Sequence, residues 1–283
     1  MPCKMRSSSR HLALVLFVTF AVFLFSSPVR CAGATTSVHL QKYGADGTLL
    51  QERTVDYQWM EQNLGVYGDG ETHYYHQGPV FEGDPWDPEE TVNLKDKGAA
   101  MGSSVRDLCD LVGGMSEGDE LMFVGVDGWH TRFAHTSIYD PPQEQGTIVL
   151  CWYNGRDGEE GERYGTGYPA NNAYSSAMQI VFMADVPNAD GKYVFGNDDM
   201  RVALPQEEYQ YFFEGQFPST NGLSGKWISE IRIYVGGVPE GVTVSKPPPE
   251  EPRSAAQSWA PYVLGLAGLA LVGVYFLMRE RAK

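Results

Sequence analysis

The sequence predicts an α+β domain with a β-rich core. Segments with the apolar, β-branched character of strands outnumber those with helical periodicity, and the two types alternate without a fixed order. The chain is 42% hydrophobic and 12% aromatic, so it can bury a core despite a formal charge of −15 at pH 7. This composition excludes the disordered, collagen-like and coiled-coil classes.

Residues 1–34 have the pattern of a signal peptide. Basic residues precede an apolar run over residues 12–25, and Ala32-Gly33-Ala34 places small residues ahead of a cleavage site before Thr35. The alternative is an uncleaved N-terminal anchor. It is disfavoured because the run is shorter than the ~20 residues that a helix needs to cross a bilayer.

The first elements of the predicted domain are a hairpin and a short helix. Residues 37–50 alternate in polarity around Asp46-Gly47, a pair that favours tight turns, so they predict a β-hairpin. Residues 54–64 resemble a strand that enters a short helix. The irregular stretch 65–90 is rich in Gly, Pro, Asp and aromatic residues, and loops of this length within a domain are often functional.

Residues 104–112 predict the clearest helix of the chain. Ser103 or Ser104 can cap its start, one face is apolar, and Gly113-Gly114 provides the stop. Later strands are predicted over residues 120–126, 147–153, 179–183 and 227–235.

The C-terminal end predicts a membrane anchor. Residues 259–278 carry no charge and are long enough to span a hydrocarbon core of ~30 Å as a helix. The basic residues in the tail 279–283 assign that tail to the cytoplasm, so the domain 35–241 is expected outside the cell membrane. The proline-rich segment 242–258 predicts an extended stalk between domain and anchor.

The charge of the exported part excludes one class of partner. Between the signal peptide and residue 252 the chain carries 13 basic and 35 acidic residues, a net charge of −22. Nucleic-acid affinity depends on Lys and Arg that neutralise phosphates. Binding of nucleic acid is therefore excluded, whereas the membrane and an extracellular protein or small-molecule ligand remain as partners.

Two cysteines, Cys109 and Cys151, remain after removal of the signal peptide. In an oxidising compartment they can form a disulfide that closes a loop of roughly 40 residues and contributes ~3–4 kcal/mol in the chain-entropy model. The alternative is two buried thiols, and the sequence leaves both open.

His73 and His76 form a candidate metal site. Side chains three residues apart converge on a helix or a turn but diverge on a strand. Nearby carboxylates could complete such a site; they are Glu71, Glu82, Asp84 and Asp87. The alternative is that both imidazoles form hydrogen bonds among the neighbouring tyrosines.

Several segments resemble the sulfite-oxidase-like molybdopterin-binding domain. Residues 104–114 (SVRDLCDLVGG), 118–123 (GDELMF) and 126–129 (VDGW) are similar to a helix, Gly stop, strand and Asp-Gly turn of that family. Residues 178–182 (MQIVF) resemble a later strand, and residues 222–233 (GLSGKWISEIRI) resemble its closing segment, which is the most specific match. The order of signal, domain, stalk and anchor is similar to that of surface proteins of methanogenic archaea.

The resemblance implies a molybdopterin-binding fold over roughly residues 38–235. It places a pterin phosphate or another anion near Gly222, Ser224 and Lys226, where Lys supplies a point charge, Ser a small donor and Gly a close approach of the backbone. Lys226 could instead lie at the surface beside a core tryptophan.

One feature of the family is missing. Its enzymes hold molybdenum through a cysteine thiolate, a soft and strongly donating ligand, in the interval that corresponds to residues 63–102, and this chain has no cysteine there. No catalytic residue is therefore assigned. The sequence favours a binding or structural module at the cell surface, with a molybdopterin-dependent oxidoreductase as the alternative. The expected recognition surface consists of Tyr67, Tyr74, Tyr75, Trp86, Trp129, Trp152 and Tyr153.

Overall fold

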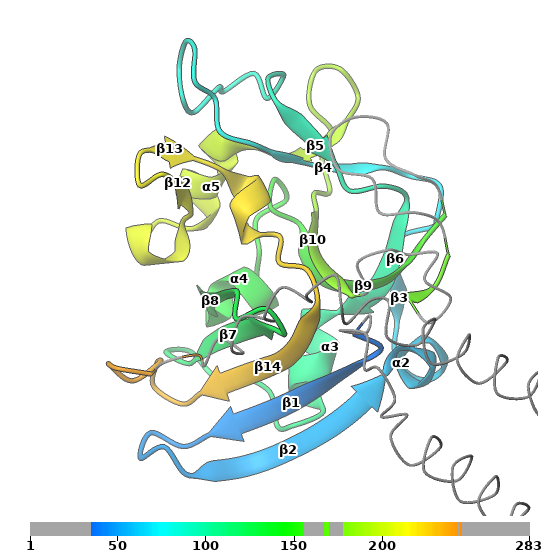
Figure 1. The fold of residues 1–283 in the computed structure, drawn as a ribbon, viewed down its shortest axis with the longest axis vertical. Helices are drawn as coiled ribbons and strands as arrows, with labels where there is room; N and C mark the ends of the chain where they lie inside the picture. The colour runs from blue at the N-terminus through cyan, green and yellow to red at the C-terminus, as the bar shows by residue number, and fades with distance from the viewer. Residues whose placement is uncertain (1–34, 156–166, 170–177, 243, 245–283) are drawn as a thin grey trace, which may run out of the picture.

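The protein is a β-rich α+β domain with few and short helices, as the sequence predicts (Figure 1). The computed structural model describes residues 35–155, 167–169, 178–242 and 244. Their strands form four sheets, of five, four, three and two strands. The predicted signal peptide, the transmembrane helix, the tail and most of the stalk lie outside the described residues. Within those residues, no helix has the length and apolar character needed to cross a membrane.

The five-stranded sheet joins the two ends of the domain. Its order is β2 (Leu49–Asp56), β1 (Ser37–Tyr43), β14 (Ile228–Tyr234), β7 (Glu120–Gly125) and β8 (His130–Ala134). β1 and β14 are parallel, and all other neighbours are antiparallel. The predicted strands 120–126 and 227–235 are confirmed as β7 and β14.

The hairpin predicted over 37–50 is confirmed as β1 and β2. Asp46 fixes its turn, because its Oδ1 accepts hydrogen bonds from the backbone N–H of Thr48 at 3.0 Å and from the hydroxyl of Thr48 at 2.6 Å. Gly47 has a φ of 79°, which a residue without a Cβ adopts easily.

The four-stranded sheet has the order β10 (Gln179–Met183), β9 (Thr147–Asn154), β6 (Ala100–Ser104) and β3 (Val66–Tyr67), with all neighbours antiparallel. β9 and β10 confirm the predicted strands 147–153 and 179–183. β3 and β6 were not predicted.

Two helices begin where the sequence offers a side-chain cap. Asp56 accepts a hydrogen bond from the backbone N–H of Trp59 at 2.7 Å and starts α2 (Tyr57–Asn63). Ser104 accepts one from Asp107 at 3.3 Å and starts α3 (Val105–Asp110). α3 ends at Asp110, two residues before the predicted bound. Gly113 and Gly114 follow with positive φ, and the N–H of Gly114 donates to the carbonyl oxygen of Cys109, as expected of a Gly stop.

The main core lies between the two larger sheets. Val38, Leu40 and Phe123 from the five-stranded sheet meet Leu150 and Trp152 from β9 in one buried cluster. α3 contributes Val105, Leu108 and Cys109 to the same cluster. The opposite face of β9 carries Val149 and Cys151, which form a separate cluster with Ala100, Val181 and Met183.

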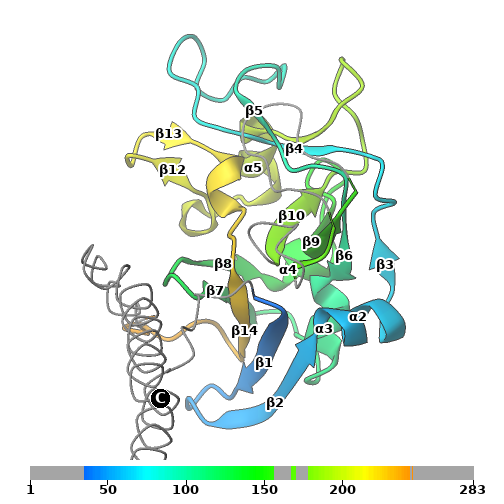
Figure 2. The ribbon, with the colours of Figure 1, turned by 45° about the vertical axis from the view of Figure 1, so that its right-hand side comes forward.

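A third layer of strands and loops forms the far end of the domain (Figure 2). Its three-stranded sheet consists of β11 (Tyr193–Phe195), β4 (Tyr74–Gln77) and β5 (Leu94–Asp96). Beside it lie α5 (Asn197–Ala203), the 3-10 helices η2 (Glu207–Tyr209) and η3 (Thr220–Leu223), and the hairpin of β12 (Phe212–Phe213) and β13 (Phe217–Pro218). The stretch predicted as irregular thus contains β3 and β4, while its remainder forms loops.

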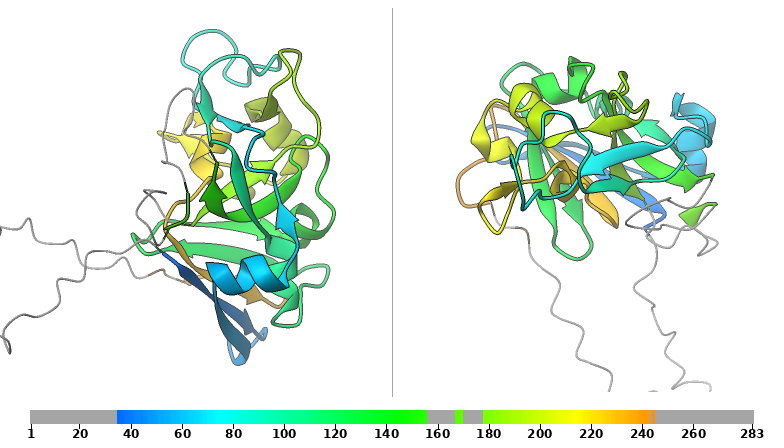
Figure 3. Two further views of the ribbon diagram at one scale, coloured as in Figure 1. Left: turned by 90° about the vertical axis from the view of Figure 1, so that its right-hand side faces the viewer. Right: turned by 90° about the horizontal axis from the view of Figure 1, so that it is seen from above.

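The C-terminal residues that the structure describes lie on the outer face of the five-stranded sheet. Val238, Val242 and Val244 pack there against the buried cluster of Met122, Val124 and Tyr234. The end of β14 and the β1–β2 hairpin lie in one half of the domain, and the 78–93 loop lies in the other half (Figures 1 and 3). The short helix α4 (His135–Tyr139) follows β8 and completes the elements.

Candidate functional site

The residues predicted to hold an anion have internal packing partners. The hydroxyl of Ser224 is buried and donates to the carbonyl oxygen of Ile180 at 2.5 Å. A Cβ on Gly222 would lie 2.0 Å from the ring of Tyr211, and one on Gly225 would lie 2.0 Å from the ring of Trp129. Both glycines are therefore explained by aromatic rings that pack on the backbone.

The alternative for Lys226 was a position at the surface beside a core tryptophan, and the structure differs from it. Lys226 is half-buried, and the side chain of Trp227 is 37% exposed at a positive φ of 53°, so Trp227 is not a core residue. A role of Gly222, Ser224 and Lys226 in anion binding stays a prediction.

The structure does not bring His73 and His76 together. His73 directly precedes β4, and His76 lies within it, where the backbone is extended and side chains alternate between faces. Nδ1 of His73 lies 2.8 Å from Oδ2 of the buried Asp96. His76 is fully buried and its Nε2 accepts from the backbone N–H of Phe182 at 3.0 Å. The part of the chain that the structure describes contains no group of three or more His, Cys, Asp or Glu placed to hold a metal ion.

Cys109 and Cys151 are two buried thiols in the structure, both free and with no exposed surface. Cys109 lies on α3 in the main core, and Cys151 lies on the opposite face of β9. The sheet separates the two side chains, so the possible Cys109–Cys151 disulfide is not formed. Burial raises the pKa of both thiols above the ordinary value, which disfavours the thiolate form that binds metals.

The aromatic residues expected to form a recognition surface are mostly internal. Trp152 and Tyr75 are buried, and Trp129 and Tyr153 pack against the main core. Of the seven, Tyr67 has the most exposed side chain, with 37% of its surface accessible.

Three phenylalanines that the sequence did not single out form an exposed patch. The ring of Phe81 lies 6.0 Å from that of Phe213 and 5.0 Å from that of Phe217, both in edge-to-face geometry. The side chain of Phe81 is 61% exposed and that of Phe213 is 37% exposed. We call Phe81, Phe213 and Phe217 the phenylalanine patch. It joins the 78–93 loop to the β12–β13 hairpin.

A shallow hollow of about 360 Å³ adjoins the phenylalanine patch. Its lining residues all come from the 78–93 loop: Pro79, Val80, Phe81, Glu82, Val92 and Asn93. Val92 is 46% exposed, so the apolar surface continues from the patch into the hollow.

A buried polar network holds the loop beside the hairpin. Gln77 donates through Nε2 to Oδ2 of Asp87 at 2.6 Å and accepts through Oε1 from the backbone N–H of Asn197 at 2.8 Å. Asn197 in turn accepts from the backbone N–H of Thr220 at 3.0 Å. Because Gln77, Asn197 and Thr220 are buried, breaking a bond among them would leave a desolvated polar atom, which costs about 1–3 kcal/mol.

The β12–β13 hairpin also packs against Trp86 of the 78–93 loop. The ring of Trp86 meets that of Phe212 at 6.1 Å and 90°, and the guanidinium of Arg201 lies 5.2 Å from the centre of the Trp86 ring. Arg201 also pairs with Asp198. The exposed phenylalanine patch therefore lies on segments that these contacts and the buried hydrogen bonds hold together.

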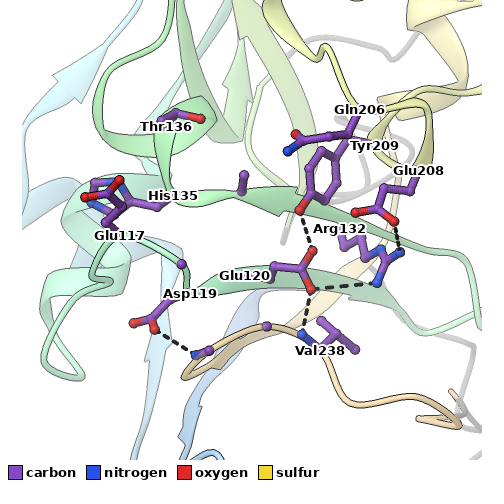
Figure 4. A pocket seen from close by; sticks show the side chains of 14 residues that line it. Glu117, Asp119, Glu120, Arg132, His135, Thr136, Gln206, Glu208, Tyr209 and Val238 are labelled. Atoms are coloured by element: carbon purple, nitrogen blue, oxygen red, sulfur yellow. Dashed lines mark hydrogen bonds and ion pairs between the residues drawn. The ribbon is translucent and has the colours of Figure 1, made fainter.

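A polar pocket of about 500 Å³ lies at the start of β7 (Figure 4). Glu120 is its central residue: its carboxylate accepts from the Tyr209 hydroxyl at 2.5 Å and from the backbone N–H of Val238 at 2.6 Å, with Arg132 at 3.7 Å. Arg132 also pairs with Glu208 at 3.1 Å. Burial and the hydrogen bond to Glu120 raise the pKa of Tyr209.

The two carboxylates at the start of β7, those of Asp119 and Glu120, both accept hydrogen bonds from neighbouring groups. Asp119 accepts from the backbone N–H of Gly236 at 3.0 Å and of Ser116 at 2.9 Å, and Figure 4 shows the first of these bonds beside the Glu120 cluster. The carboxylates therefore hold the turn after β14 against β7. This arrangement stabilises the turn that follows β14.

Neither a family model nor a curated protein matches this chain.

Proposed function

We propose that this chain is a single-pass cell-surface protein whose exported domain is a binding module. The observation that carries the proposal is the phenylalanine patch, with Phe81 61% exposed on a loop that buried hydrogen bonds hold in place. Exposure of large apolar rings opposes solubility and is typical of interaction sites. Aromatic side chains supply large contact areas with few rotatable bonds.

The surface location rests on the pattern of the chain ends. The signal peptide directs export, the segment 259–278 anchors the chain, and the stalk 242–258 holds the domain away from the bilayer with the tail 279–283 in the cytoplasm. The Glu120 and Asp119 contacts support this arrangement, because they fasten the turn after β14 from which the stalk continues.

The resemblance to the sulfite-oxidase-like domain concerns the scaffold in this proposal, not its redox chemistry. The residues present do not fit a molybdenum cofactor: residues 63–102 supply no thiol, and Cys109 and Cys151 are sealed in separate clusters. Ser224 and Gly222 are occupied by internal partners. No redox step is assigned to the domain.

The test is the cofactor content of the full chain after expression in a host that makes molybdenum and tungsten cofactors. Elemental analysis and pterin fluorescence of the purified protein should both give values near background. Stoichiometric metal with pterin would contradict the proposal and support the alternative, an oxidoreductase outside the membrane.

A further inference from the structure

The phenylalanine patch lies between two segments that contain acids and no bases. Residues 79–94 include five acids, Glu82, Asp84, Asp87, Glu89 and Glu90, and neither Lys nor Arg. Residues 202–218 include three acids, Glu207, Glu208 and Glu214, and again no base. Arg201, which directly precedes the second segment, is paired with Asp198. The apolar rings are therefore bordered by carboxylates.

Two of the patch residues are each followed in the sequence by a glutamate. Glu82 follows Phe81 directly, and Glu214 follows Phe213, and both are exposed. At exposed positions their charge acts over about a Debye length, roughly 10 Å at 0.1 M salt. A partner that covers the rings also enters this field, so cationic groups beside its apolar anchor are favoured and anionic groups are disfavoured.

The loop and hairpin that carry the patch lie in the half of the domain opposite to the C-terminal residues that the structure describes (Figures 1 and 2). The C-terminal residues that the structure describes pack on the five-stranded sheet, while the 78–93 loop and the β12–β13 hairpin lie in the other half of the domain (Figures 1 and 2). If the stalk leads to the membrane, the patch lies in the half of the domain farther from the described start of the stalk (Figures 1 and 2). A membrane surface is then a poor occupant, and a second copy of this acidic chain would bring like charges together.

We propose that the phenylalanine patch binds a polypeptide segment of another protein that presents an apolar side chain flanked by Lys or Arg. The apolar side chain covers Phe81 and enters the hollow beside Val92, and the cations lie near Glu82 and Glu214. This inference rests on the proposed function, because it names the surface and the partner class of the binding module.

The experiment uses the full chain in nanodiscs of zwitterionic phosphatidylcholine, which do not attract basic peptides. A random displayed peptide library is selected on it, and the most enriched peptide is synthesised with a fluorophore for anisotropy titration. The expected peptide has an apolar residue between Lys or Arg residues. Selection of acidic peptides, or of none, would overturn the inference.

Variants locate the binding surface. Phe81→Ser should weaken the affinity by about tenfold or more, since a central ring is removed. The matched control is Tyr67→Ser, which removes an exposed ring on β3 and should change the affinity less than about twofold. Glu82→Gln with Glu214→Gln should weaken binding about threefold or more at low salt and less at high salt. Thermal unfolding of each variant shows whether the fold is retained.

The outcomes separate this inference from the proposed function. If Phe81→Ser leaves peptide binding unchanged, the patch is not the binding site, although the domain is still a binding module. If sedimentation shows that the unmodified chain self-associates and that Phe81→Ser does not, the patch binds a second copy of this chain. That result would overturn the proposed class of partner. Failure of the proposed function itself appears separately, as stoichiometric metal and pterin in the same preparation.

Discussion

His76 and Phe182 are joined by a buried hydrogen bond in which the ring nitrogen Nε2 accepts from the backbone N–H at 3.0 Å. The carbonyl oxygen of Phe182 is farther away, at 3.4 Å, so the neutral ring with its proton on Nδ1 fits best. The ring meets that of Phe182 edge to face at 5.4 Å. This histidine links β4 to the four-stranded sheet and holds the base of the 78–93 loop.

This geometry predicts that acid destabilises the fold through His76. Burial, followed by the positive charge of Lys97, lowers the pKa of His76 well below 6.5. The unfolded chain then binds a proton below about pH 6.5 that the folded chain does not, so the free energy of unfolding falls as the pH is lowered from there. Urea unfolding at a series of pH values measures the slope. His76→Gln, which keeps an acceptor, should reduce it, whereas the exposed His130→Gln should leave it unchanged.

Glu90 predicts the opposite pH dependence. Its carboxyl lies against Gly196, where a Cβ would be 2.2 Å from Oε1, and Oδ2 of Asp199 lies 3.3 Å from the backbone nitrogen of the same glycine. Burial, then a hydrogen bond to Asp199 and the charges of Asp199, Asp198 and Asp87, raise the pKa of Glu90 from 4.5 to about 9.

The unfolded chain loses the Glu90 proton near pH 4.5, and the folded chain keeps it until about pH 9. Stability from this group is therefore complete below pH 4.5 and is lost as the pH rises through 9. Glu90→Gln keeps a donor towards Asp199 and should raise the melting temperature at pH 9 relative to the unmodified chain. The exposed neighbour variant Glu89→Gln is the control. An equal change of melting temperature in both variants would contradict the hydrogen bond between Glu90 and Asp199.

Gly225 tests whether the glycines of the closing segment serve ring packing. A methyl group there would overlap the Trp129 ring, so Gly225→Ala should lower the free energy of unfolding by about 1–3 kcal/mol. At Gly65 the nearest atoms lie 3.6 Å from a Cβ, which is ordinary contact, so Gly65→Ala should cost less than about 1 kcal/mol. Urea unfolding compares the two. Similar small costs would show that the Trp129 ring yields easily and that its packing does not require glycine.

The thiols are predicted to be inert in the native protein. Cys109 and Cys151 have no exposed surface, so a maleimide reagent should label neither until denaturant is added. Peptide mapping without reduction should yield the two cysteine peptides separately. A linked peptide would contradict the positions of the two side chains on opposite faces of β9.

Local signals made much of the fold predictable. The Asp46-Gly47 turn and the cap and Gly stop around α3 depend on residues within a few positions, and both are formed as predicted. The parallel pairing of β1 with β14 could not be inferred, because it joins opposite ends of the domain. The short strand β6 also escaped prediction, since its sequence has little β-branched character.

The candidate site was less predictable than the fold. Phe81 stands in an irregular stretch and Phe213 beside another phenylalanine, so neither position reveals that both rings are exposed together. Their positions depend on the buried bond between Gln77 and Asn197, which are 120 residues apart. The tyrosines and tryptophans were predicted for the surface because of their polar tips, but packing against the core determines most of their positions.

The most direct test of the central claim is native mass spectrometry of the full chain from a host that makes molybdenum cofactors. Solubilised in mild detergent, the protein should have the mass of the processed polypeptide, alone or with a polypeptide partner that Phe81→Ser releases. An added mass equal to a metal-bearing pterin, retained in Phe81→Ser, would contradict the claim that the phenylalanine patch and not a redox centre is the functional site.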